Sequence, residues 1–249
     1  MTNFADQTEK GPSKTPRGTR IYAVGDVHGR ADLLGQMLKM IEADLDASPI
    51  GTHQVVFLGD YLDRGADGAA VVQMLQAGPP PRLADGAWIC LCGNHEDALL
   101  DFLEDVSCGP LWLSNGGWST VESYVGNHIG NPADLVALQA QLRHKIPHAH
   151  RHFLKCLTLW HEAGDYLFVH AGLRPGVSLD DQDPSDLLWI RGPFLHSAFD
   201  FGKIIVHGHS IVSAPDVRAN RIGIDTGACY SGRLTTLVLE GEERRFLTT

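Results

Sequence analysis

The chain has 249 residues, of which 43% are hydrophobic and 20% are charged, a balance that is ordinary for a globular protein with a sizeable core. Its 30 acidic residues outnumber 20 Lys and Arg, and the net charge of -10 argues against non-specific nucleic-acid binding, which depends on basic patches. The sequence has no run of 18 apolar residues, so no transmembrane helix is predicted, and five cysteines without framework spacing favour a reducing cytoplasm.

Residues 1–19 are polar, contain Gly and Pro, and lack the apolar stretch of a secretory signal, so we expect a flexible tail there. The folded domain is then expected to span residues 20–249. It begins with a short apolar strand over 21–24 that runs into a polar, Gly-containing loop. A helix is predicted next, because Leu33, Met37, Ile41 and Leu45 recur every four residues.

The same plan of strand, polar loop and helix is predicted twice more. A strand over 54–58 precedes a helix over 69–75, and a strand over 88–92 precedes a helix over 97–104. The mostly helical segment 97–165 is expected to form a lid or rim. Strands over 166–169, 204–206, 222–224 and 234–239 complete a single α/β domain.

Polar side chains of metal-binding type stand directly after the predicted strands. They are Asp26, His28, Asp60, Asn94, His95, His170 and His209. Ligands of α/β sheets bind at the carboxyl ends of strands, so we expect these side chains to converge. Carboxylate, amide oxygen and imidazole together suit Mn²⁺, Fe²⁺ or Zn²⁺. Seven such groups are too many for one ion and suit a pair of ions about 3.5–4 Å apart.

Five segments in order carry a family resemblance: Asp26-Val27-His28-Gly29, Gly59-Asp60-Tyr61-Leu62-Asp63-Arg64-Gly65, Gly93-Asn94-His95-Glu96, His170-Ala171-Gly172 and Gly208-His209. They resemble the signature of the metallophosphoesterases of the PPP serine/threonine phosphatase family, in particular its bacterial and phage members. The resemblance runs from about residue 21 to 240. It implies the calcineurin-like fold, with two central β-sheets flanked by helices, and a protein phosphatase that acts on phosphoserine and phosphothreonine in proteins or peptides.

The resemblance also implies a role for each site residue. One ion is held by Asp26 and His28, Asp60 bridges both ions, and the second ion is held by Asn94, His170 and His209. The ions are expected to be Mn²⁺, with Fe or Zn as alternatives, and a hydroxide between them attacks the ester directly.

Four side chains complete the implied active site. His95 is the general acid that protonates the leaving alkoxide, and Asp63 orients its ring. Arg64 and Arg191 clamp the phosphate oxygens, because a guanidinium fork binds them in pairs. Asn94 also faces the substrate.

Other interpretations remain open at this stage. A symmetrical diadenosine tetraphosphatase shares the same two-metal core, although Glu96 and the complete Asp63-Arg64-Gly65 lean away from it. A broad small-molecule phosphoesterase and a non-catalytic scaffold are the further alternatives. His207 stands two residues from His209, so spacing alone cannot choose between them. His148 and His152 are expected on one solvated helix face, and neither a nucleic acid nor a membrane is expected as a partner.

Overall fold

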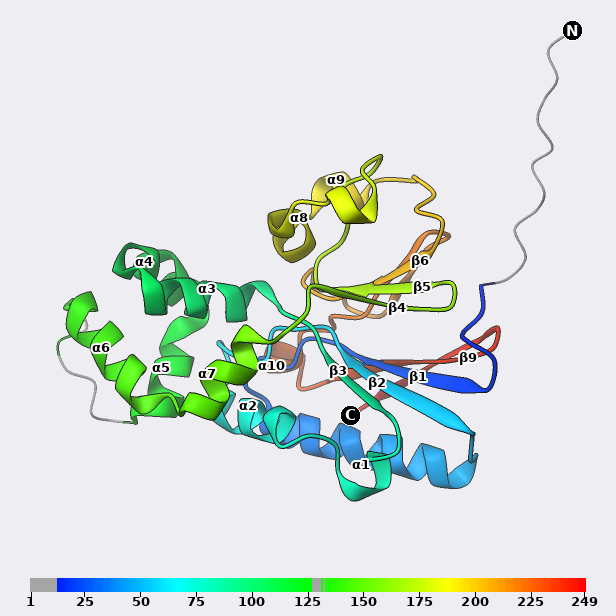
Figure 1. The fold of residues 1–249 in the computed structure, drawn as a ribbon, viewed down its shortest axis with the longest axis horizontal. Coiled ribbons are helices and arrows are strands. Elements are labelled where there is room, and N and C mark those ends of the chain that lie inside the picture. The colour runs from blue at the N-terminus through cyan, green and yellow to red at the C-terminus, as the bar shows by residue number, and fades with distance from the viewer. Residues whose placement is uncertain (1–12, 127–130, 132) are drawn as a thin grey trace, which may run out of the picture.

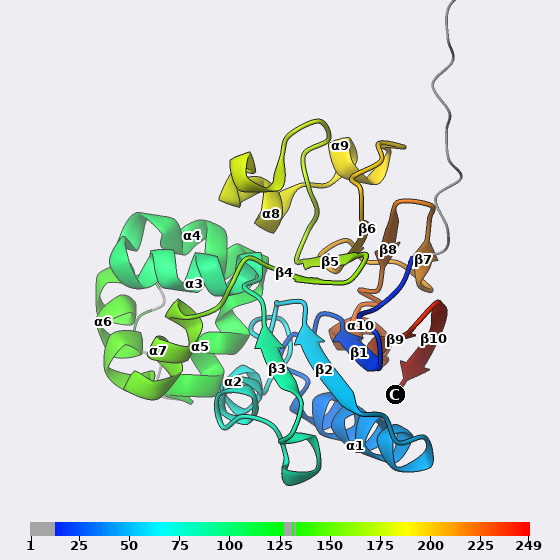
Figure 2. The same ribbon diagram turned by 45° about the vertical axis from the view of Figure 1, so that its right-hand side comes forward.

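Two five-stranded β-sheets pack face to face, and helices cover both outer sides (Figure 1, Figure 2). This computed structural model describes residues 13–126, 131 and 133–249. The layered arrangement confirms the predicted calcineurin-like architecture. Within the described ranges, no helix is long and apolar enough to cross a membrane.

The first sheet carries most of the predicted strand–loop–helix units. Its strands lie in the order β10 (Glu243–Thr248), β9 (Thr235–Glu240), β1 (Thr19–Val24), β2 (Thr52–Phe57) and β3 (Ala87–Cys90). Strands β1, β2 and β3 are parallel, so their carboxyl ends open onto one edge. Both faces of β1 are buried, with Tyr22 on the helix side and Ile21 on the side of the other sheet. Such two-sided burial explains why β1 is continuously apolar.

The second sheet brings two more loops to the same region. Its strands lie in the order β4 (Trp160–Ala163), β5 (Tyr166–Val169), β6 (Ile204–His207), β8 (Arg221–Gly223) and β7 (Asp216–Val217). Strands β5, β6 and β8 are parallel. Phe168 and Val206 pack against Ile21 and Val56 of the first sheet in the core between the layers.

The helices form three main groups, two of which cover the sheets. The first sheet is covered by α1 (Ala31–Ala47) and α2 (Gly68–Gln76), and the second by α8 (Pro184–Trp189) and α9 (Gly192–Leu195). The short α10 (Ala228–Ser231) precedes β9. The remaining helices form a separate cluster at one end of the molecule (Figure 1): α3 (Asn94–Glu104), α4 (Gly109–Trp112), α5 (Trp118–Val125), α6 (Leu135–Lys145) and α7 (His148–Lys155).

Several element boundaries differ from the sequence-based prediction. Helix α3 begins at Asn94 rather than residue 97, because the Glu96 carboxylate accepts the Gly93 N–H and so closes the first turn. The helical rim ends at Lys155, and residues 160–163 form β4 of the second sheet. Strands β7 and β10 were not predicted. Residues 1–12 of the expected tail lie outside the described residues, whereas Thr15 donates its N–H to Gly241 O at 3.0 Å.

Candidate metal centre and active site

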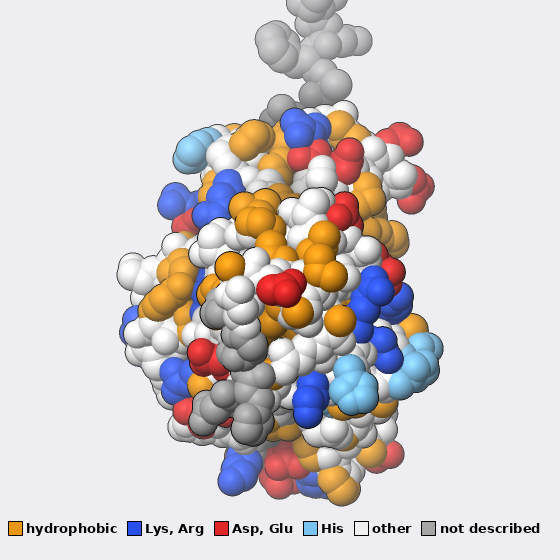
Figure 3. Space-filling model, turned by 90° about the vertical axis from the view of Figure 1, so that its left-hand side faces the viewer, with side chains coloured by type: hydrophobic (Ala, Val, Ile, Leu, Met, Phe, Trp, Pro, Cys, Tyr) orange, Lys and Arg blue, Asp and Glu red, His pale blue; other side chains and the backbone are white. Residues whose placement is uncertain are grey.

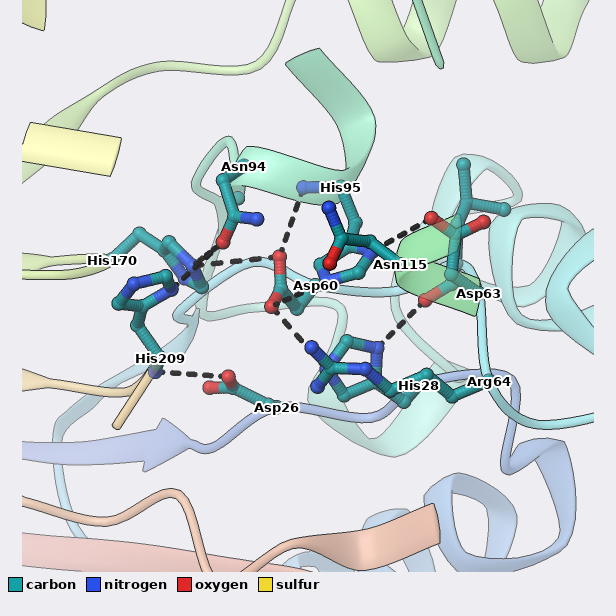
Figure 4. Close-up of polar contacts among 12 residues, drawn as sticks. Asp26, His28, Asp60, Asp63, Arg64, Asn94, His95, Asn115, His170 and His209 are labelled. Carbon is teal, nitrogen blue, oxygen red and sulfur yellow. Dashed lines mark hydrogen bonds and ion pairs between the residues drawn. The ribbon is translucent and has the colours of Figure 1, made fainter. Parts of the chain in front are cut away.

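The loops that follow five different strands meet in one buried cluster (Figure 4). The predicted ligands come from the loops after β1, β2, β5 and β6 and from the first turn of α3, which follows β3. They are Asp26, His28, Asp60, Asn94, His170 and His209, each at most 5% exposed. The predicted convergence of these residues is therefore present in the structure.

The backbone is strained where the predicted site residues stand. Among the described residues, five that are not glycine have positive φ, and all five belong to the predicted site. They are His28 (43°), Asp60 (52°), Asp63 (67°), Arg64 (66°) and His209 (60°). Positive φ is uncommon for residues with a side chain, and such strain gathers at functional sites because the surrounding fold has to hold it. This pattern marks the cluster independently of any sequence motif.

Asp60 lies at the centre of the cluster. Its Oδ2 is 3.3 Å from His28 Nε2 and 3.9 Å from His95 Nε2, and its Oδ1 is 3.4 Å from His170 Nε2. Burial opposes ionisation, yet the three imidazoles hold the pKa of Asp60 well below its ordinary value. Asp60 is therefore an anion between two groups of imidazoles, as a bridging carboxylate has to be.

Asn94 connects the two histidines of the second group. Its Oδ1 is 2.9 Å from His170 Nε2 and 2.8 Å from His209 Nδ1. Asp26 lies beside this pair. Its Oδ2 accepts the backbone N–H of His209 at 2.9 Å, while its Oδ1 is buried without a hydrogen-bond partner. A Cβ on Gly208 would overlap Asp26 Oδ1, so the backbone approaches the carboxylate as only glycine allows.

His28 and His170 each turn Nε2 towards Asp60. His28 Nδ1 lies 2.8 Å from Leu62 O, and His170 Nδ1 lies 2.8 Å from Leu58 O. A backbone carbonyl only accepts, so each Nδ1 carries a hydrogen, and Nε2 is the ring nitrogen that can bind an ion. Burial lowers the pKa of His170 and so opposes protonation of that ring. Metal-binding histidines commonly donate the other N–H to a carbonyl in this way.

Two groups of three ligands can hold ions within the described part of the chain. One contains His28, Asp60 and His95, and the other contains Asp60, His170 and His209. Asp60 belongs to both groups, so the geometry is that of a dinuclear site. The first group contains His95 in place of the predicted ligand Asp26, whose Oδ2 accepts the backbone N–H of His209 and whose Oδ1 has no hydrogen-bond partner.

His95 makes a short hydrogen bond that fixes its ring. His95 Nδ1 donates to Asp63 Oδ2 at 2.6 Å. Burial opposes protonation of His95, but the carboxylates of Asp60 and Asp63 outweigh it and raise its pKa. An imidazole held as a proton donor at near-neutral pH is what a general acid requires.

Two residues of the helical cluster hold Asp63 in turn, and sequence reasoning missed both. Trp112 Nε1 donates to Asp63 Oδ2 at 2.9 Å, and the Thr120 hydroxyl donates to Asp63 Oδ1. Asp63 N–H also donates to Thr120 Oγ1 at 2.9 Å. Trp112 lies three residues before Asn115-Gly116-Gly117, and its spacing gives no signal that the indole reaches the site.

Two arginines lie at the rim of the cluster. Arg64 Nη1 donates to His28 Nε2 at 2.6 Å, and Arg191 Nε donates to His209 Nε2 at 3.0 Å. The structure thus places both predicted phosphate clamps beside the candidate ligands. Arg64 comes from the β2 loop and Arg191 from the junction of α8 and α9, so they approach from the two opposite sheets.

Glu96 has a structural role that the sequence did not reveal. Its carboxylate accepts the backbone N–H groups of Asp60, Tyr61 and Leu62 at 2.8–3.1 Å, and that of Gly93 at 3.0 Å. It therefore holds the strained Asp60 loop in place.

His207, His148 and His152 lie outside the cluster. His207 is buried with its ring 5.0 Å from that of Phe194, so of the two neighbours only His209 joins the candidate ligands. His148 and His152 stack on an exposed face of α7 with ring centroids 6.5 Å apart, as expected of a solvated surface.

Comparisons with known proteins agree with this geometry. The model of the calcineurin-like phosphoesterase family matches residues 19–231. Serine/threonine-protein phosphatase 2 of Salmonella typhimurium is 29% identical over 86% of this chain and 90% of the relative. An asymmetrical bis(5'-nucleosyl)-tetraphosphatase of Oceanobacillus iheyensis is 24% identical over 87% of each chain. A crystal structure provisionally assigned as a diadenosine tetraphosphatase aligns over 94% of this chain and 98% of its own, with a TM-score of 0.62 at 21% identity.

Proposed function

The chain belongs to the calcineurin-like phosphoesterase family, and on that basis we propose that it is a protein phosphatase that hydrolyses phosphoserine and phosphothreonine. The observation that carries the proposal is the Asp63–His95 pair beside the two ion-binding groups, with Asp60 shared between them. The likeness to Salmonella serine/threonine-protein phosphatase 2 supports a phosphoprotein substrate.

Two divalent ions are the proposed cofactors, with Mn²⁺ first and Fe or Zn as alternatives. Asp26, His28 and Asp60 would hold one ion, and Asp60, Asn94, His170 and His209 the other. When bound, such a pair neutralises phosphate charge and makes a water strongly nucleophilic near neutral pH. His28 Nε2 cannot serve an ion and Arg64 at once, so an ion bound there would release the guanidinium for contact with phosphate oxygens.

The chain's own groups supply the remaining chemistry. Arg64 and Arg191 each offer a fork of N–H donors to the phosphate oxygens. His95 gives a proton to the leaving alkoxide, which is a poor leaving group without it. Such proton donation is worth about 10²–10⁴-fold in rate. Asp63, held by Trp112 and Thr120, keeps the donating ring in place.

A second candidate activity is hydrolysis of dinucleoside tetraphosphates. The Oceanobacillus relative carries that activity in its name, and the chain matches it over most of its length. Comparing kcat/KM for a phosphothreonine peptide with that for diadenosine tetraphosphate separates the two proposals. A clear preference for the peptide is expected, and a strong preference for the dinucleotide would replace the first proposal by the second.

A further inference from the structure

A small cavity lies beside the proposed general acid. Its volume is about 230 Å³, and it lies between α3, the turn around α4 and the end of α8. Asn94 and His95 form one wall, so the cavity opens where the leaving group of a bound ester would lie. Asp97, Asp101, Leu111 and Trp189 are among the other residues that line it.

Two carboxylates on one wall have no cationic partner in the part of the chain that the structure describes. Asp97 and Asp101 stand one turn apart on α3, and neither forms an ion pair with a Lys, Arg or His among the described residues. Like charges at this spacing destabilise a helix. Asp97 is half-buried in this wall, and Asp101 is exposed beside it. The wall is therefore suited to a cation that this part of the chain does not supply.

The opposite walls are aromatic and aliphatic, and they are open. The side chain of Trp189 is 40% exposed and that of Leu111 is 68% exposed. Figure 3 faces the end of the molecule formed by the α3–α7 cluster and shows acidic side chains lying among hydrophobic ones there. A guanidinium stacks on an indole face and pairs with carboxylates at its edge, which a compact ammonium does less well. The combination of Trp189 with two acids fits arginine.

The size of the cavity matches a single side chain. Pockets that bury a whole small molecule have volumes of about 300–1,000 Å³, whereas this cavity has about 230 Å³. A polyphosphate would also bring negative charge towards Asp97 and Asp101, which is unfavourable in a partly buried place.

We propose that this cavity binds the side chain of an arginine near the phosphorylated residue, so that the enzyme prefers phosphoserine and phosphothreonine in basic sequences. This inference rests on the proposed protein phosphatase function. Asp97 and Asp101 would select the charge, and Trp189 would hold the planar guanidinium.

A set of phosphothreonine peptides tests the preference directly. One neutral alanine-rich sequence is compared with variants in which a single Arg or a single Glu occupies each of the three positions on either side of phosphothreonine. At one position or more, we expect Arg to raise kcat/KM about tenfold over Ala, as for a partly desolvated charge pair, and Glu to lower it. Equal kcat/KM values for Arg, Ala and Glu at every position would overturn the inference.

The double variant Asp97→Asn, Asp101→Asn tests the residues themselves. The measured quantity is the ratio of kcat/KM for the best Arg peptide to that for the Ala peptide, taken within each variant so that general losses cancel. The ratio should fall to near one, and Asp101→Lys should reverse the preference towards Glu. Asp85→Asn is the matched control, because Asp85 is an exposed acid before β3, at the far end of that strand, and its ratio should equal that of the wild type.

The outcomes also separate this inference from the function on which it rests. If the Ala peptide is hydrolysed and the ratio is one in the wild type, the Arg subsite is wrong and the phosphatase proposal stands. If no peptide is hydrolysed while diadenosine tetraphosphate is, the protein phosphatase proposal fails and the subsite fails with it. If Asp85→Asn lowers the ratio as much as the double variant does, the preference is a general charge effect, and the subsite is overturned.

Discussion

Replacing Asp63 by Asn isolates the group that positions the proposed general acid. The change keeps the size of the side chain but removes the charge that His95 Nδ1 contacts at 2.6 Å. Hydrogen bonds to charged groups contribute about 1.5–3 kcal/mol. At about 1.4 kcal/mol per tenfold change in rate, kcat for a phosphothreonine peptide should fall by about 10- to 150-fold.

The leaving group determines how much of this loss appears. Threonine leaves as an alkoxide and needs a proton, whereas p-nitrophenolate is stable without one. The assay therefore compares the loss of kcat for a phosphothreonine peptide with that for p-nitrophenyl phosphate, on protein whose metal content is measured in parallel. We expect a large loss for the peptide and a much smaller loss for the nitrophenyl ester.

The pH profile gives a second measurement on the same variant. In the wild type, burial lowers the pKa of His95, but the carboxylates of Asp60 and Asp63 raise it above its ordinary value. Without the Asp63 charge the pKa of His95 falls, so the protonated acid is lost at a lower pH. The alkaline limb of kcat for the peptide should therefore move towards lower pH. Equal losses with both esters, or an unmoved limb at full metal content, would refute the positioning role.

The remaining predictions concern the other parts of the site. Asp60→Asn should remove most bound metal together with activity, measured by elemental analysis, because Asp60 belongs to both ion-binding groups; full occupancy would contradict this. His95→Asn should lower kcat for a phosphothreonine peptide by about 10²–10⁴-fold while metal stays bound, and a negligible change would remove His95 from the acid role. Arg64→Ala should weaken inhibition by inorganic phosphate as well as turnover, and an unchanged inhibition constant would show that Arg64 does not contact phosphate. Trp112→Phe should reproduce the substrate-dependent loss of Asp63→Asn in weaker form, because it removes one of the donors to that carboxylate.

Much of the site could be predicted because local sequence determines it. Each short parallel strand ends in a polar loop, and parallel strands bring such ends to one edge, so Asp26, Asp60 and His170 could be placed together without coordinates. The glycines in these loops mark close backbone approach, which the structure shows at Gly208. His170 follows β5 of the second sheet, so its place beside Asp60 depends on how the two sheets pack.

What the sequence did not reveal depends on contacts between distant segments. Trp112 and Thr120 reach Asp63 only because the helical cluster folds back over the β2 loop, and neither residue belongs to a motif. Glu96 belongs to the Gly93-Asn94-His95-Glu96 motif, but its hydrogen bonds to the Asp60 loop could not be predicted from that motif. Strand β10 was missed because it begins with three charged residues in a row, Glu243, Arg244 and Arg245, and lies at the edge of the sheet next to β9.

Counting metal ions tests the central claim most directly. The protein is stripped of metal, loaded with Mn²⁺, passed through a desalting column, and analysed for metal per chain alongside its Asp60→Asn variant. Two groups of ligands that share Asp60 predict about two ions per wild-type chain and a large loss of bound metal in the variant. A wild-type chain that binds no ion, or binds a single ion that Asp60→Asn does not affect, would contradict a dinuclear centre built around Asp60.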